Sequence, residues 1–386
     1  MTAHFPRILE RKHYSELRRR IIHRVLQPLF QTGNARLAPM ASSSGADVRS
    51  ILVCRPNHRL GNLLLLTPLL TEIQRVFPNA EVDIVLAGEH VAELFRSFPN
   101  VKHIYVLSRR MARHPLAVMC TMLAIRRARY DLAIDPCEAS QSARVLVTVA
   151  GAKHVIGAPR GGTTVVSAPV ANAPIHMAKW PVHLLRRALG RQSPEHGDGF
   201  PVLDIRLSGD ERQHARATLE RVTGRQEPGF VIGVFAEATG AKGYGSERWL
   251  RFLRVVHTQF PDAAIVEIAP ADGRPRLADE IPSFASPSPR EVAAVIAGMT
   301  CFVSADCGIM HLASAAGTPT IGLFSVTDAS RYAPYGHGSG ALDTNGKSPE
   351  DVAREASALI WKIRAGSAVG PRDCFHGVQL GNGGAG

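Results

Sequence analysis

The stretch "ILVCRPNHRLGNLLLLTPLL", residues 51–70, joins a short apolar run to a turn containing glycine and then to a strongly apolar segment. The run at 51–54 predicts a buried β-strand, because it is short and apolar throughout. Gly61 lets the backbone approach a ligand closely. Pro68 would break a helix if it lay deep inside one, so a regular helix is expected to begin at Thr67. The stretch therefore predicts a strand, a ligand-binding loop and a helix.

The same alternation of strands and helices continues along the chain. In the first half, apolar runs predict strands at 51–54, 82–86, 101–106, 131–134 and 154–157. Helical spacing predicts intervening helices at 69–77, 90–97, 115–129 and 140–150. After a less regular stretch, strands are expected at 230–235, 263–268, 301–304 and 320–324, with helices at 180–189, 210–222, 246–260, 289–298, 308–316 and 350–364. The rhythm is typical of an α/β fold with two Rossmann-like domains facing each other across a cleft, where ligands bind at the carboxyl ends of strands.

This pattern predicts that the chain is divided into four parts. Residues 1–48 are expected to form a basic arm and a linker rich in serine, and residues 49–205 the first Rossmann-like domain. The second Rossmann-like domain is expected at 206–365, and the glycine-rich tail 366–386 is expected to be disordered.

Charge indicates the kind of partner. The 386 residues are 45% apolar and 20% charged, as in globular proteins, but the net charge is +12. Such a balance favours polyanionic partners. Basic residues gather in 1–30, where apolar residues recur at helical spacing, so this arm is either an amphipathic helix on an anionic membrane surface or a solvated terminus. Nucleic acid is not expected, since no aromatic or zinc-binding elements accompany the charge.

The sequence also indicates where the protein is located and whether it binds a metal ion. No run of about 18 apolar residues spans a bilayer, and no apolar region follows the basic start as in a signal peptide. The six cysteines are scattered without a C-x-x-C pair. They predict reduced thiols in the cytoplasm, with no metal site.

A second loop, residues 236–245, follows the expected strand at 230–235. It carries three glycines, Thr239 and Lys242 ahead of a helix that Ser246 is expected to cap. Backbone amides, a hydroxyl and an ammonium group make a cradle for an anion. The alternative is a flexible loop with a solvated lysine. The loop is not a Walker A motif, so an ATPase is not expected.

A third loop, "SADCGIMH" at 304–311, links a buried strand to a short helix. Free amides near Cys307 and Gly308, at the helix start, favour phosphate binding. Asp306 either faces that ligand or only caps the helix. His311 either contacts the ligand or fills space between the domains.

Three further carboxylates stand at strand ends. Asp135 and Glu138 follow the strand at 131–134 and are candidate acid–base groups. Glu267, at the end of 263–268, either accepts a hydrogen bond from a ribose hydroxyl or stands at the rim without a ligand.

Together these motifs resemble glycosyltransferase family 9, the lipopolysaccharide heptosyltransferases, over roughly residues 50–360. The matching residues are "ILVCRPNHRLGNLLLLTPLL", "FPNAEVDIVL", "YDLAIDPCEASQSA", the glycine/lysine loop ahead of "SERWL", and "SADCGIMHLASAAGTPTIGLFSVTD". The resemblance implies a GT-B fold with the donor site mainly in the second domain and a final helix packing back toward the first. It implies inverting transfer of a heptose from ADP-heptose to a lipid-linked core oligosaccharide, without metal or other cofactor. It also implies a cytoplasmic protein, peripheral on the inner face of the bacterial inner membrane.

One position departs from the family. After Arg59 and Gly61 the family usually has Asp, the general base that takes the proton from the acceptor hydroxyl, whereas this chain has Asn62. Either Asp135 or Glu138 replaces that base, or Asn62 only orients the acceptor and the proton leaves late in an oxocarbenium-like transition state.

The alternative is a weak or inactive protein that binds a nucleotide sugar or glycolipid. Loss of a general base costs about 10²–10⁴-fold, so weak transfer would survive. A dehydrogenase is not expected, because the first loop lacks G-x-G-x-x-G. The sequence leaves the exact sugar, the acceptor and the oligomeric state open.

Overall fold

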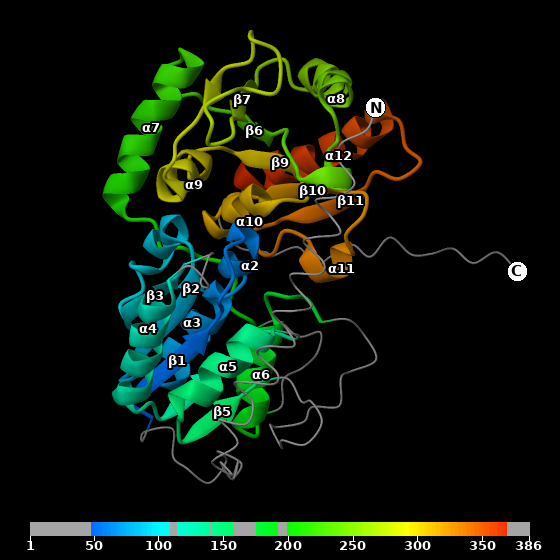
Figure 1. Cartoon of the computed structure of the whole chain (residues 1–386). Helices are drawn as coiled ribbons and strands as arrows, with labels where there is room; N and C mark the ends of the chain where they lie inside the picture. Colours follow the sequence, from blue (N-terminus) through cyan, green and yellow to red (C-terminus); the bar gives the residue numbers. More distant parts are fainter. Residues whose placement is uncertain (1–47, 109–113, 139, 158–174, 192–198, 369–386) are drawn as a thin grey trace, which may run out of the picture.

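The structure is a computed structural model that describes residues 48–108, 114–138, 140–157, 175–191 and 199–368 (Figure 1). The predicted membrane arm at 1–30 and nearly all of the predicted disordered tail lie outside these residues. The described chain forms two α/β halves, one above the other in Figure 1.

The first half contains a five-stranded sheet in the order β3-β2-β1-β4-β5, in which every pair is parallel. Its strands are β1 (Ser50–Cys54), β2 (Glu81–Ala87), β3 (Val101–Leu107), β4 (Leu132–Ile134) and β5 (His154–Ile156). The helices between them are α2 (Leu60–Leu64), α3 (Thr67–Val76), η5 (Glu89–Phe95), α4 (Pro115–Ala128) and α5 (Gln141–Ala150). The central strand β1 is buried along almost its whole length, as its apolar run predicts.

The second half contains a six-stranded parallel sheet in the order β11-β10-β9-β6-β7-β8. Its strands are β6 (Val231–Phe235), β7 (Ala264–Ile268), β8 (Ser283–Phe284), β9 (Cys301–Ala305), β10 (Thr320–Phe324) and β11 (Gly340–Asp343). The helices from residue 180 onward are α6 (Trp180–Ala188), α7 (Gly209–Thr223), η7 (Gly240–Lys242), α8 (Ser246–Gln259), α9 (Pro289–Ala297), α10 (Gly308–Ala315), α11 (Ala329–Tyr332) and α12 (Pro349–Ala368). The strand order of both sheets confirms the prediction of an α/β fold with two Rossmann-like parts.

Several local expectations change. The helix at Thr67 begins where Pro68 predicts, but the separate helix α2 precedes it. The N-cap of α8 is Gly245, so Ser246 is its first residue and not its cap. The last helix runs to Ala368, past the expected start of the tail, and packs against α8 and β11 of the second half. The resemblance had implied a helix folded back on the first half.

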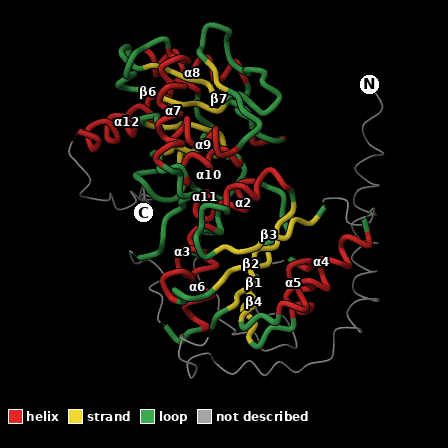
Figure 2. The backbone as a smooth tube through the Cα atoms, turned by 90° about the vertical axis from the view of Figure 1, so that its left-hand side faces the viewer, coloured by secondary structure: helices red, strands yellow, loops and turns green. Residues whose placement is uncertain are grey.

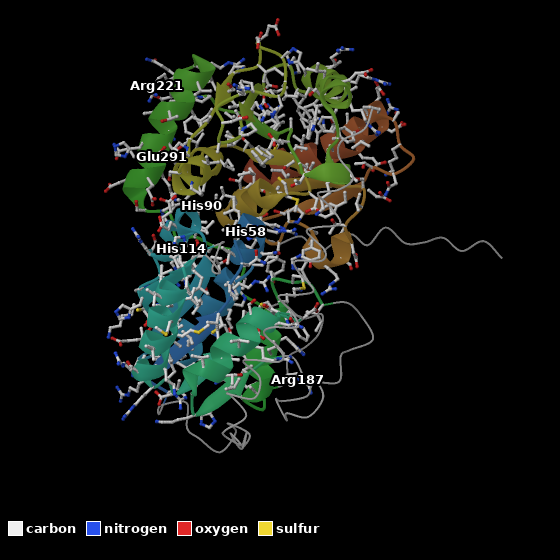
Figure 3. The ribbon with its side chains drawn as sticks, viewed as in Figure 1. His58, His90, His114, Arg187, Arg221 and Glu291 are labelled. Carbon is white, nitrogen blue, oxygen red and sulfur yellow. The ribbon has the colours of Figure 1, made fainter. Side chains whose placement is uncertain are left out.

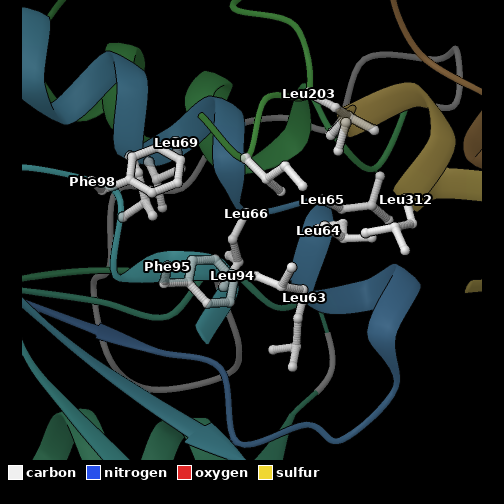
Figure 4. Packing of buried hydrophobic residues seen from close by; sticks show 14 of the residues in the cluster. Leu63, Leu64, Leu65, Leu66, Leu69, Leu94, Phe95, Phe98, Leu203 and Leu312 are labelled. Atoms are coloured by element: carbon white, nitrogen blue, oxygen red, sulfur yellow. The ribbon is translucent and has the colours of Figure 1, made fainter. Parts of the chain in front are cut away.

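The two halves share a buried apolar cluster. Leu63, Leu64, Leu65 and Leu66 belong to the same cluster as Leu312 of α10, and Figure 4 shows them beside one another. The helices α2 and α10 pack together in both views (Figures 1 and 2). The strong apolarity of the opening stretch thus has a structural cause, because it joins the halves as well as covering its own sheet.

A buried ion pair fixes the connection near α3. Glu72 is fully buried, and both its oxygens accept hydrogen bonds from Arg186 of α6, at 2.8 and 3.2 Å. The hydroxyl of Thr67 accepts a hydrogen bond from the amide of Asp204. These contacts hold the chain on α3 before it enters α7.

Candidate functional site

The opening loop and the third loop meet where α2 crosses α10. A Cβ atom added to Gly61 would lie 2.7 Å from Cδ2 of His311, and one added to Gly308 would lie 3.1 Å from Cβ of Leu60. The first separation would force a neighbour to move, and the second would be a tight contact, so glycine at both positions allows the helices to pack closely. The carboxyl ends of β1 and β9 therefore face a common junction, as the sequence predicts.

Asn62 is the third residue of α2, and it is half-buried. The N-cap is Arg59, an exposed residue whose side chain makes no capping hydrogen bond. The turn before the helix is held by Asn57, whose Oδ1 accepts from the amide of Arg59 at 2.8 Å. Asn62 therefore does not cap α2, and its amide side chain stands in the first turn of the helix, beside Gly61.

The second and third loops are joined by an ion pair. Nζ of Lys242 lies 2.5 Å from Oδ2 of Asp306, and the side chains are 37% and 8% exposed respectively. The N-cap of α10 is Cys307, with no side-chain capping bond, so Asp306 does not cap this helix. Thr239 is exposed immediately before η7, which contains Lys242. One partly exposed ammonium group is thus held beside the first residues of α10.

Cys307 and His311 are uncharged parts of this junction. Burial raises the pKa of the Cys307 thiol, whose Sγ lies 3.3 Å from Oγ of Ser304. Burial is the main cause that lowers the pKa of His311 to about 4, and repulsion from the positive charges of His176 and Lys242 adds to it. Within the described residues, Nδ1 of His311 is buried without a hydrogen-bond partner. Its ring packs against Gly61, which supports the space-filling interpretation of this histidine.

A second histidine of the same kind lies nearby in the chain leading to α6. Nε2 of His176 donates to the carbonyl of Ala333 at 3.0 Å, because its Nδ1 accepts from the amide of Ala178. The ring stacks on Tyr335 at 5.1 Å between centroids. Burial lowers the pKa of His176 to about 4.

We expect these two histidines to make the protein less stable in acid. An unfolded histidine titrates near 6.5, so between pH 6.5 and about 4 the unfolded chain binds more protons than the folded one, and stability falls as pH falls. The effect is ~2 kcal/mol per histidine between pH 6.5 and 5. Urea unfolding at pH 7 and pH 5 measures it. The difference in unfolding free energy between pH 7 and pH 5 should be smaller in His311→Gln than in the natural chain. It should be unchanged in His257→Gln, a control on the exposed surface of α8.

At the end of β4, Asp135 is buried within a polar cluster. Its Oδ1 accepts from the amide of Cys137 at 3.0 Å, and Sγ of Cys137 accepts from Nη1 of Arg55 at 2.9 Å. Burial raises the pKa of Cys137 to about 11, so the thiol stays protonated. Arg55 was missing from the predicted site. The only sequence signal for it was a basic residue directly after the apolar strand β1.

Glu138 is held by an ion pair between the halves. Its Oε2 lies 2.5 Å from Nη2 of Arg331 in α11, and this hydrogen bond raises the pKa of the arginine. Arg331 also lies outside the predicted set, because nothing in its local sequence links it to a strand end in the other half. The ion pair neutralises Glu138, which leaves Asp135 as the stronger candidate for a base.

Glu267 differs from both interpretations made for it. The side chain is fully buried, and its two oxygens accept hydrogen bonds from the amides of Arg276 and Leu277 at 2.8 and 3.1 Å. It therefore shapes the loop after β7 and does not stand at a rim.

Two properties concern the described residues only. They contain no group of three or more histidine, cysteine, aspartate or glutamate side chains that would hold a metal ion. None of the helices in this part of the chain is both long enough and apolar enough to cross a membrane.

Solved structures share this architecture. A glycosyltransferase of family 9 from Veillonella parvula DSM 2008 matches with a TM-score of 0.67 and 17% identity, over 83% of this chain and 99% of that one. E. coli ADP-heptose lps heptosyltransferase II matches with a TM-score of 0.62 and 17% identity, over 82% and 99%. E. coli heptosyltransferase WaaC with ADP matches with a TM-score of 0.59 and 20% identity, over 81% and 99%. These likenesses confirm the GT-B fold.

Among the curated proteins, none matches this chain at a significant level. The model of glycosyltransferase family 9 (heptosyltransferase), however, matches residues 121–359, which span more than half of the chain. That range contains the loops of Asp135, Lys242 and Asp306. The chain belongs to glycosyltransferase family 9, and it is a glycosyltransferase with the GT-B fold.

Proposed function

We propose that the protein transfers a heptose, or a similar sugar, from an ADP-sugar to a lipid-linked core oligosaccharide of lipopolysaccharide. Transfer proceeds with inversion and without a metal ion. The observation that carries the proposal is the Lys242–Asp306 pair beside the start of α10, at the contact between the two halves. Support for the donor comes from WaaC, whose structures contain ADP and ADP-2-deoxy-2-fluoro heptose.

The second half binds the leaving group. Lys242 moves its charge from Asp306 to the pyrophosphate, and amides at the start of α10 donate to the phosphate oxygens, with Thr239 supplying a hydroxyl. These fixed donors stabilise the negative charge that develops on the pyrophosphate as its bond to the sugar breaks. His311 stays neutral below the site and keeps the junction packed, while Cys307 is the N-cap of α10.

The first half supplies the acceptor side. The acceptor hydroxyl attacks the anomeric carbon from the face opposite the pyrophosphate, which inverts the configuration. A new carbon–oxygen bond forms as the bond to the pyrophosphate breaks, and the hydroxyl proton passes to the Asp135 carboxylate. Asn62 orients the acceptor through its amide. The lipid-linked acceptor places the protein at the cytoplasmic face of the bacterial inner membrane as a peripheral protein.

Nucleotide binding and transfer test the proposal directly. Calorimetric titration should show ADP binding more tightly than UDP or GDP, and ADP-heptose should label a lipid-linked acceptor with inverted anomeric configuration. Chelation of divalent ions should leave the rate unchanged. A preference for UDP or GDP would overturn the donor, and loss of transfer on chelation would overturn the metal-free step.

Asn62 favours a second candidate, a catalytically weak protein that binds a nucleotide sugar or glycolipid. Under the main proposal, Asn62→Asp changes kcat/KM by less than about tenfold, because Asp135 already takes the proton. Asn62→Gln, which keeps the amide but moves it, is the matched control and should raise the KM for the acceptor. A gain of several hundredfold in Asn62→Asp would show instead that the natural chain lacks a working base.

A further inference from the structure

One side of α4 carries exposed apolar side chains in the part of the chain that the structure describes. Leu116, Met119 and Leu123 are 71%, 51% and 46% exposed, and they are three of the six large apolar side chains exposed among the described residues. At 100° per residue they fall within one narrow arc of the helix, and Ile125, the one buried residue of α4, lies on the opposite side. We call these three residues the α4 apolar face.

Such a face is unusual for a helix of an α/β half. The other main helices of the first half bury a full stripe of apolar residues, whereas α4 rests on α5 and buries Ile125 alone. Contiguous exposed apolar side chains mark a surface that meets a partner. A partner that covers the α4 apolar face removes the cost of exposing it to water.

Charge identifies the chemistry of that partner. The sequence from 108 to 130 contains six arginines and no aspartate or glutamate. Arg126, Arg127 and Arg129, at the end of α4, are exposed. The terminal arm at 1–30 is itself basic, and a second copy of this chain would bring the same positive charge against α4. An apolar face with a basic border suits a surface that is apolar inside and anionic outside.

We propose that α4 binds an anionic lipid bilayer through Leu116, Met119 and Leu123. Arg126, Arg127 and Arg129 then lie at the lipid headgroups. The helix follows β3 and therefore begins at the carboxyl edge of the first sheet, the edge that holds Asp135. His114, the residue before α4, lies near the junction of the halves (Figure 3). Membrane binding through α4 therefore turns the acceptor side of the site toward the lipid. The meaning of this orientation rests on the proposed function.

Cys120 offers a probe within α4, because it lies one turn after Leu116 and is the one exposed thiol among the described residues. In the full chain carrying Cys374→Ser, an environment-sensitive fluorophore on Cys120 should shift to the blue with phosphatidylglycerol vesicles and not with phosphatidylcholine vesicles. As a control, the same dye on Val326→Cys in a Cys120→Ser/Cys374→Ser background should not shift, because Val326 is exposed on the second half.

The affinity is measured by sedimentation with the same vesicles. Leu116→Gln/Met119→Gln/Leu123→Gln keeps good helix formers and should weaken binding about tenfold or more, whereas Val326→Gln should not. Deleting residues 1–30 should also weaken vesicle binding. In the shortened chain, the triple variant should lower the vesicle affinity by the same factor as in the full chain.

Three results would overturn the proposed membrane contact of α4. The first is unchanged vesicle binding by the triple variant. The second is dissociation of an oligomer by that variant, which would assign the face to a second copy. The third is faster labelling of Cys120 after deletion of 1–30, which would assign the face to the arm. Calorimetry with ADP shows whether the triple variant is folded, and a donor preference other than ADP would sink the proposed function without changing the vesicle result.

Discussion

Replacing Lys242 with methionine is expected to lower kcat/KM for transfer by about 10²–10³-fold and to weaken ADP binding. The substitution removes the ammonium group that neutralises the pyrophosphate. It also leaves Asp306, which is only 8% exposed, without its cation. An unpaired carboxylate beside the start of α10 repels a phosphate that the helix would otherwise attract.

The double variant Lys242→Met/Asp306→Asn separates these two causes. Removing the carboxylate charge should recover part of the lost ADP affinity but not the lost rate, so the two substitutions should not be additive. Lys347→Met is the matched control, because Lys347 also pairs with a carboxylate, Glu355, in the second half. Equal losses in Lys347→Met and Lys242→Met would contradict the assignment of Lys242 to the donor.

Asp135→Asn is expected to lower kcat by about 10²–10⁴-fold with little change in the KM for the donor. Asparagine has the shape of aspartate, and its carbonyl oxygen still accepts from the amide of Cys137. The local fold is therefore kept while the proton acceptor is lost.

Glu138→Gln is the companion to that measurement. It removes the charge from the pair with Arg331, which joins the two halves, so we expect a raised KM and a smaller loss of kcat. A greater loss of kcat in Glu138→Gln than in Asp135→Asn would move the base to Glu138.

The sequence predicts the strands well because each sheet is covered by helices. The runs at 51–54 and 320–324 are short, apolar and bounded by turns, so they have no other way to be buried. The helix α2 was missed because a glycine and a proline within eight residues favour a loop, yet packing against α10 stabilises one turn and a half of helix there. The strand β11 was missed because "GALD" carries little of the apolar signal.

The candidate site shows the same division between local and distant causes. Lys242 and Asp306 were predicted from their own loops, since each follows a strand at the carboxyl edge of one sheet. Their ion pair, by contrast, links residues 64 positions apart. The partner of Glu138 is 193 positions away, and the burial of Glu267 depends on a loop that folds back over it. Local composition contains no record of such contacts, so sequence periodicity has no means to reveal them.

The crossing at Gly61 and Gly308 has a consequence for how the chain tolerates substitution. Neither glycine has a positive φ, so an alanine would fit the backbone at both positions, and the constraint on them is one of volume alone. The volume available at residue 61 therefore depends on the side chain at residue 311. A shorter side chain in place of His311 makes room for a methyl group on residue 61, so suppressors of Gly61→Ala should arise at 311. In a combinatorial library randomised at 61 and 311, the functional variants should keep the summed volume of the two side chains constant.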